Sequence, residues 1–318
     1  MFKSKLAQVL MKLKAFIIAK PVIAIVVAIA VIAIPITTIL VLSVNGGDEK
    51  ATEGLEYELV DGGYSVKMEN ATGNVIIPSK YKGKSVTSIG DYAFYCSSLE
   101  SIEIPSSVSS IGYAAFYYCS RLVSIEIPND SKLSSIGGSA FQSCYSLLSI
   151  DIPSSVESIG SHAFYGCSSL ESIEIPSSVS SIGEFAFADC SRLASIEIPS
   201  SVTSIGDAAF YECSRLAFIE IPSSVESIGE LAFYYCSSLA SIEIPSSVSS
   251  IGWYAFANCN SLESIKIPSS VSSIGWYAFA NCSKLTIYAE VSEGEIPTGW
   301  DSAWNPDKRP VQWGGTGE

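Results

Sequence analysis

One phrase of about 23 residues repeats along most of this chain, and this repetition constrains the fold more than any other feature. Each copy carries an Ile-Pro pair, and the last five spacings between its prolines are all 23 residues. The nine prolines are Pro78, Pro105, Pro128, Pro153, Pro176, Pro199, Pro222, Pro245 and Pro268. A fixed period in the range of about 20–50 residues is typical of a solenoid, in which each repeat forms one coil that stacks on its neighbours.

Within one repeat, the order of residue types predicts a short strand, a turn and a short helical segment. Ile102 and Ile104 flank Glu103, an alternation that buries two side chains and exposes the third. Pro105 ends this strand because proline has no N–H to donate to the next coil. The Ala-Phe pair that follows each repeat glycine predicts one or two helical turns on the opposite, convex side. The predicted fold is therefore a solenoid of nine coils, with short parallel strands and short convex helical turns.

The N-terminal segment has the composition of a membrane anchor. Residues 1–20 carry five lysines and no acidic residue, and residues 21–44 contain no charge at all. An uncharged stretch of this length is sufficient to cross a bilayer as a helix. The lysines precede it, which predicts a single-pass signal anchor with a cytoplasmic N-terminus and an extracellular repeat domain. The alternative is a signal peptide that is cleaved near residues 43–47, which would release a secreted protein.

The remainder of the chain divides into four parts. Residues 45–54 are a polar linker, and residues 55–75 are an N-terminal cap with strand-like alternation around a Gly-Gly turn. The solenoid itself spans residues 76–287, and residues 288–318 form a C-terminal cap and tail. The tail contains Trp300, Trp304 and Trp313, which we expect to cover the last coil; an aromatic sugar-binding platform is the alternative.

The strand position that faces solvent is acidic in almost every copy, and it is the main candidate for a ligand-binding face. The aligned residues are Glu103, Glu126, Asp151, Glu174, Glu197, Glu220, Glu243 and finally Lys266. Such a row could bind a basic partner or divalent cations, or it could be a solvated face that arose by duplication of one repeat. Phe218 interrupts the serine row that flanks this column, and we expect it to be an exposed contact residue. The formal net charge of −14 argues against a nucleic-acid partner, because phosphates would be repelled.

The nine cysteines occupy one slot of successive repeats, which predicts buried free thiols. Their number is odd, so they cannot all pair with one another, and a straight row does not match a tetrahedral zinc site. His162 is the only histidine, and no Ser/His/Asp constellation or phosphate-binding loop accompanies it. The sequence therefore predicts no catalytic residue, no metal site and no cofactor.

The repeat I-P-S-S-V-x-S-I-G-x-x-A-F-x-x-C-S-S-L-x-S-I-x-I-P resembles the BspA-type leucine-rich repeats of bacterial and protist surface proteins. The entry G-L-E-Y-E-L-V-D-G-G-Y-S-V and the exit G-W-D-S-A-W-N are similar to the ends of that family, so the resemblance extends over about residues 54–314. It implies a cell-surface solenoid of the leucine-rich repeat class without enzymatic activity, with adhesion or host and matrix binding in some members. We therefore expect a membrane-anchored binding or adhesion module whose protein or glycan ligand lies on the concave face. The alternative function is a passive surface coat or spacer.

Overall fold

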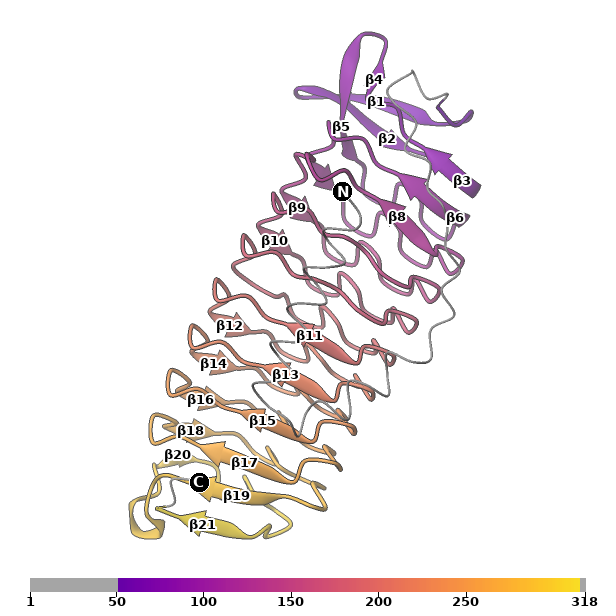
Figure 1. Ribbon diagram of the computed structural model, residues 1–318. Helices are drawn as coiled ribbons and strands as arrows, with labels where there is room; N and C mark the ends of the chain where they lie inside the picture. Colours follow the sequence, from indigo (N-terminus) through magenta and orange to yellow (C-terminus); the bar gives the residue numbers. More distant parts are fainter. Residues whose placement is uncertain (1–50, 315–318) are drawn as a thin grey trace, which may run out of the picture. The chain divides into compact units, whose positions relative to one another are not determined.

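The computed structural model describes residues 51–314, and they form a β-solenoid of stacked coils (Figure 1). The predicted membrane segment at residues 21–44 and the basic segment at residues 1–20 lie outside these residues. Within residues 51–314, no helix has the length and apolar character that a membrane crossing requires. The mature N-terminus predicted for a cleaved signal peptide also falls outside this range.

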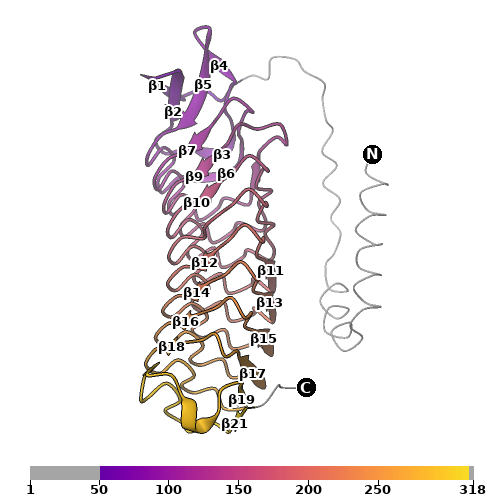
Figure 2. The same cartoon turned by 90° about the vertical axis from the view of Figure 1, so that its left-hand side faces the viewer.

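Two ladders of short parallel strands run along the stack, on different sides of each coil (Figure 2). We name the first the Ser-Ile ladder, after the residues that most of its rungs share. Its rungs are β2 (Gly63–Lys67), β5 (Lys84–Ile89), β7 (Ser110–Ile111), β9 (Ser135–Ile136), β10 (Ser158–Ile159), the bridge at Ile182, β12 (Ser204–Ile205), β14 (Ser227–Ile228), β16 (Ser250–Ile251), β18 (Ser273–Ile274) and β20 (Gly299–Trp300). The pairing from β2 to β20 is unbroken.

The second ladder, which we name the acidic ladder, contains the predicted strands. Its rungs are β3 (Thr72–Ile76), β6 (Ser98–Glu103), β8 (Ser124–Glu126), the bridges at Asp151 and Glu174, β11 (Ser195–Glu197), β13 (Phe218–Glu220), β15 (Ser241–Glu243), β17 (Ser264–Ile267), β19 (Thr286–Ala289) and β21 (Val311–Trp313). Beyond the two ladders, β1 (Glu56–Val60) pairs antiparallel with β2, and β4 (Lys80–Tyr81) forms a hairpin with β5.

The stack contains about 11 coils, which corrects the prediction of nine. The two additional coils come from segments that do not follow the repeat. Residues 55–75 supply β2 and part of β3, and the tail supplies β20 and β21. An end coil leaves backbone N–H and C=O groups without partners, so a flanking segment can join the ladder without matching the repeat.

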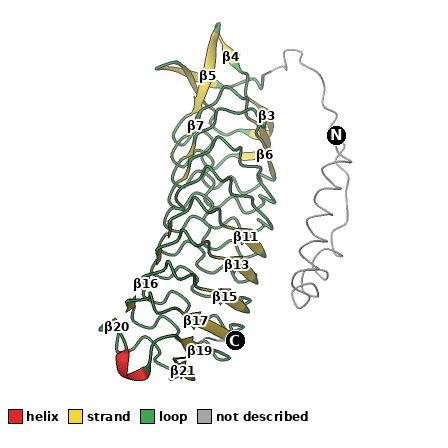
Figure 3. Cartoon of the chain, turned by 60° about the vertical axis from the view of Figure 1, so that its left-hand side comes forward, coloured by secondary structure: helices red, strands yellow, loops and turns green. Residues whose placement is uncertain are grey.

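The turn segments between each repeat glycine and cysteine are not helical, contrary to the prediction. In residues 137–144, the N–H groups of Ala140, Gln142 and Cys144 donate to carbonyls three residues back. The intervening N–H groups donate instead to the next coil, at 2.7–2.8 Å. An α-helix satisfies its N–H groups within itself, so this alternation excludes one. Within residues 51–314, the only helix is the 3-10 turn η1 (Glu293–Glu295), shown in red in Figure 3.

Each turn segment contains two residues in the left-handed (positive φ) backbone conformation, and the repeat glycine lets the segment pack closely against the previous coil. Ser139 and Ser143 have φ of 55° and 60°, and an equivalent pair recurs in each repeat. Gly183 has an ordinary φ, but a Cβ atom there would lie 2.6 Å from the backbone N of Ser161 in the previous coil. The glycine is therefore required by the approach of one backbone to another.

A column of stacked phenylalanine rings forms the centre of the core. The column comprises Phe94, Phe116, Phe141, Phe164, Phe187, Phe210, Phe233, Phe256 and Phe279, all with 0% exposure. Adjacent ring centroids lie 5.1–5.7 Å apart, and the ring planes are nearly parallel. The last ring, Phe279, meets Trp304 edge to face at 5.8 Å, so the tail continues the column.

Eight of the nine cysteines are buried free thiols, as predicted. Each donates its S–H to the carbonyl of a phenylalanine in the preceding coil, for example Cys213 to Phe187 at 3.1 Å. Burial raises the pKa of the Cys167 and Cys213 thiols to about 12, so both remain protonated at neutral pH.

Cys96 is the exception, because it is exposed. Only one residue separates it from Phe94, so it occupies the left-handed slot that Tyr118 fills in the next coil. Ser97 takes the buried slot instead, and its hydroxyl donates to the carbonyl of Phe94.

Shortening one ring of the column should destabilise the whole stack. Phe187→Ala should lower the free energy of unfolding by about 3–5 kcal/mol, because it leaves a cavity between two neighbouring rings. Urea denaturation of the full chain in detergent, followed by circular dichroism, measures this change. The control is Tyr235→Ala, which removes a ring that is 43% exposed and should cost less than about 1 kcal/mol. Equal losses in the two variants would contradict the assignment of the core.

Candidate functional site

The structure brings the predicted acidic residues into register along one side of the stack. Glu103 pairs with Glu126, Glu174 bridges Asp151 to Glu197, and Glu197 pairs with Glu220. Glu243 then pairs with Lys266, which pairs with Tyr288. The alternation of each strand explains this arrangement, because the isoleucines on either side point into the core. We call the seven acidic residues from Glu103 to Glu243 the acidic column.

Most of the acidic column is exposed, and it gathers negative charge on one face. Glu103 is half-buried, and the other six residues are exposed. Adjacent rungs of a sheet lie about 4.8 Å apart, and two charges at that distance repel by about 1 kcal/mol in water before salt screening. The column is not one continuous ladder, because strand pairing lapses between β8 and Asp151 and between β13 and β15.

The charge pattern reverses at the C-terminal end of the column. The Lys266 Nζ atom lies 3.1 Å from Oε1 of Glu290, and Oε2 of Glu290 accepts the N–H of Ser269 at 2.9 Å. The Ser269 N–H, and then Lys266, hold the pKa of Glu290 below its usual value. Beside this pair lies a shallow cleft of about 430 Å³, lined by Glu243, Lys266, Tyr288 and two serines. This end of the face therefore offers both signs of charge within one concavity.

Phe218 occupies the predicted position beside the acidic column, but its side chain is less exposed than predicted. It pairs with Ser195 in the neighbouring rung, so it occupies the serine position that flanks the column. Its side chain is half-buried and not exposed as expected. A phenyl ring beside a strand can fold down over neighbouring aliphatic atoms, which a serine cannot do.

The turn segments carry an aromatic surface that the sequence reasoning missed. Tyr92, Tyr113, Tyr118, Tyr235, Trp253 and Trp276 are between 42% and 55% exposed. They occupy the variable slots of the repeat, where a search for periodic residues finds no signal. The sequence signal that could have indicated this surface is the high frequency of aromatic residues at repeat positions that do not face the core. His162 belongs to this surface, and its ring stacks on Phe185 at a centroid distance of 4.8 Å.

The comparisons with known proteins agree with this architecture. The family model of the BspA type leucine rich repeat region matches residues 87–217 and 157–286. This protein belongs to that family. Its resemblance to BspA-type repeats, stated above from the motif, is thereby confirmed.

Two solved structures show the likeness in three dimensions. A leucine-rich repeat protein from Bacteroides ovatus has 31% sequence identity and a TM-score of 0.72, over 84% of this chain and 71% of that one. A leucine-rich repeat protein from Eubacterium ventriosum has 27% identity and a TM-score of 0.51, over 66% of this chain and 65% of that one. Among proteins with curated descriptions, none matches.

Membership of the BspA-type family is consistent with a binding or scaffold role on a surface. Leucine-rich repeat proteins are generally not enzymes. Within residues 51–314, no group of three His, Cys, Asp or Glu side chains is arranged to hold a metal ion. The candidate site of this BspA-type protein is the acidic column together with the cleft at its end.

Neutralising the acidic column should stabilise the solenoid at low salt. The fourfold Gln variant changes Glu174, Glu197, Glu220 and Glu243 to Gln. Its melting temperature should be higher than that of the native chain, because like-charge repulsion between adjacent rungs is removed. The gain should shrink as salt screens the charges. Thermal unfolding at two salt concentrations measures it.

The matched control changes Glu157, Glu226, Glu263 and Glu293 to Gln, which alters the net charge equally at exposed positions outside the column. If this control gains as much stability as the column variant, net charge and not the row itself explains the effect.

Proposed function

We propose that this BspA-type protein is a membrane-anchored cell-surface module that binds a partner through the acidic ladder. One observation carries the proposal: seven carboxylates are aligned on one face and six of them are exposed. A row of like charges destabilises a fold unless another contact compensates for it. A partner with basic side chains would remove that repulsion on binding and would be attracted over a long range.

The cleft beside Lys266 supports a specific docking geometry for such a partner. A basic segment aligned with the column would meet Lys266 at one end, and the like charge would oppose any shift past that point. The acidic column would then supply attraction, and Lys266 would fix the register. These charges favour a basic protein ligand on this face over a neutral ligand.

The passive surface coat remains the second candidate function, because near-identical neighbouring repeats are expected from duplication alone. A binding screen separates the two. The full chain in detergent is applied to immobilised extracellular-matrix proteins and to glycans, and then the fourfold Gln variant is applied to every positive target. A binding face predicts that the variant loses at least about tenfold in affinity and that native binding weakens with salt. The variant with Gln at 157, 226, 263 and 293 should bind normally. Binding that is the same in all three proteins would reject the acidic column as the contact surface.

The membrane part of the proposal rests on composition, since residues 21–44 lie outside the described range. Their lack of charge and the five preceding lysines support an anchor with the repeats outside the cell. External protease on intact cells should then remove the repeats and leave a membrane-bound fragment of about 45 residues. A soluble protein with a new N-terminus after Val44 would instead show that the segment is a cleaved signal.

A further inference from the structure

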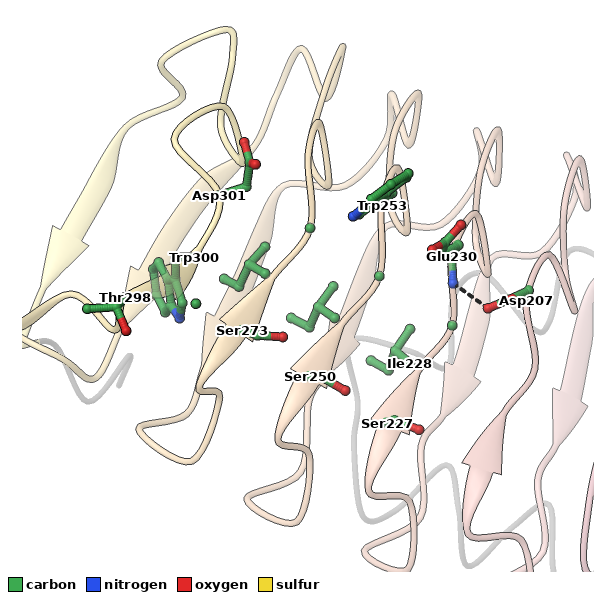
Figure 4. A pocket seen from close by; sticks show the side chains of 16 residues that line it. Asp207, Ser227, Ile228, Glu230, Ser250, Trp253, Ser273, Thr298, Trp300 and Asp301 are labelled. Carbon is green, nitrogen blue, oxygen red and sulfur yellow. Dashed lines mark hydrogen bonds between the residues drawn. The ribbon is translucent and has the colours of Figure 1, made fainter.

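A second concave surface lies on the Ser-Ile ladder, away from the acidic column. It is a groove of about 500 Å³ that crosses the rungs β14, β16, β18 and β20 (Figure 4). Glycines such as Gly252 and Gly275 line it and allow the coils to pack closely, because a Cβ atom at either would lie 2.4–2.5 Å from a backbone N of the previous coil. The four rungs extend over about 15 Å, since adjacent strands lie about 4.8 Å apart.

Serine hydroxyls form one side of this groove, one on each of three successive rungs. Ser227, Ser250 and Ser273 pair directly with one another along the ladder. No hydroxyl of these three serines is hydrogen-bonded to any residue in the range 51–314. The adjacent serines differ, because Ser249 and Ser272 each donate to a carbonyl of the previous coil at 3.1 Å. The groove serines are therefore available to a ligand, and the flanking serines are used by the fold.

The opposite side of the groove carries an exposed indole between carboxylates, as Figure 4 shows. The Trp253 side chain is 55% exposed, and its ring lies against Gly275 at a place that a Cβ atom would occupy. The absence of a Cβ atom at Gly275 thus leaves room for the indole. Asp207 and Glu230 lie on one side of Trp253 along the stack, and Asp301 lies on the other. Trp300 is buried below them and donates its Nε1–H to the carbonyl of Val271 at 3.0 Å.

These groups match the chemistry of a carbohydrate. The charged residues that line the groove are all acidic, so an anionic ligand would be repelled. Carboxylates accept hydrogen bonds from sugar hydroxyls, serines both donate and accept, and an indole face packs on the C–H side of a pyranose ring.

The repeating element of the groove is neutral, and this decides between a glycan and a basic peptide. The hydroxyl recurs on every rung from β14 to β18, whereas the carboxylates stand at the two ends of the groove. A repeating row of neutral hydrogen-bonding groups fits a repeating neutral ligand. We propose that this groove binds an extended neutral glycan, with one sugar stacked on Trp253 and its neighbours hydrogen-bonded to the serine row. The site is independent of the acidic column.

Tryptophan fluorescence and calorimetry of the full chain in detergent test this inference. The probes are the β-1,4-linked hexaoses of glucose, xylose and mannose, together with decalysine as the basic-peptide alternative. Trp253→Ala removes the stacking surface, and Ser250→Ala removes the central hydroxyl with little change in shape. Trp276→Ala is the matched control, since it removes an indole that is 42% exposed in the equivalent slot of the next coil but does not line the groove.

At least one hexaose should bind the native chain. Trp253→Ala should weaken that binding by about tenfold or more, Ser250→Ala should weaken it by a smaller factor, and Trp276→Ala should change it less than twofold. The fourfold Gln variant of the acidic column should bind the hexaose normally, so the two proposals fail separately. The inference is wrong if no hexaose binds at millimolar concentration, if only decalysine binds, or if both tryptophan variants lose affinity equally.

Discussion

The bonding of each turn segment to the next coil is the constraint on which this solenoid depends. Alternate N–H groups close tight turns within a coil, and the intervening ones donate to the following coil. The backbones approach so closely that a Cβ atom at Gly183 would meet the neighbouring chain. The same spacing brings the phenylalanine rings into a continuous stack and places each cysteine S–H on a phenylalanine carbonyl. The packing of the core is therefore set by the distance between adjacent coils.

The strands of the acidic ladder and the inward-facing residues could be predicted from the sequence, because both recur at fixed positions of the repeat. The two-residue rungs of the Ser-Ile ladder were not predicted. Ile102 and Glu103 alternate as a strand requires, and Phe187 occupies its buried slot. The turns could not be predicted in the same way. The spacing Ala-Phe-x-x-Cys is compatible with a helix, and left-handed residues such as Ser139 are not glycine and give no sequence signal. The end coils were missed because backbone pairing needs no particular side chains.

The candidate surfaces show the same division. The acidic column was found because its residues recur at one strand position, and strand register then brings them together. The groove on the Ser-Ile ladder depends on Trp253 and Trp300, which occupy unrelated positions in the repeat and in the tail. No periodic pattern connects these two residues. Trp300 lines the groove because the tail adds the rung β20, which only the folded structure shows.

The stacking account is tested most directly by the unfolding free energy of Gly183→Ala. Gly183 has a φ that other residues adopt readily, so without close coil packing the change would be neutral or stabilising by about 0.4–1 kcal/mol. Close packing predicts the opposite sign, a loss of about 2 kcal/mol or more, because the new methyl group would overlap the backbone of Ser161. Gly294→Ala is the control, since its Cβ would meet nothing within 4 Å. Denaturant titration of the full chain should show a large loss for the first variant and little change for the second. Unchanged or increased stability of Gly183→Ala would contradict the account.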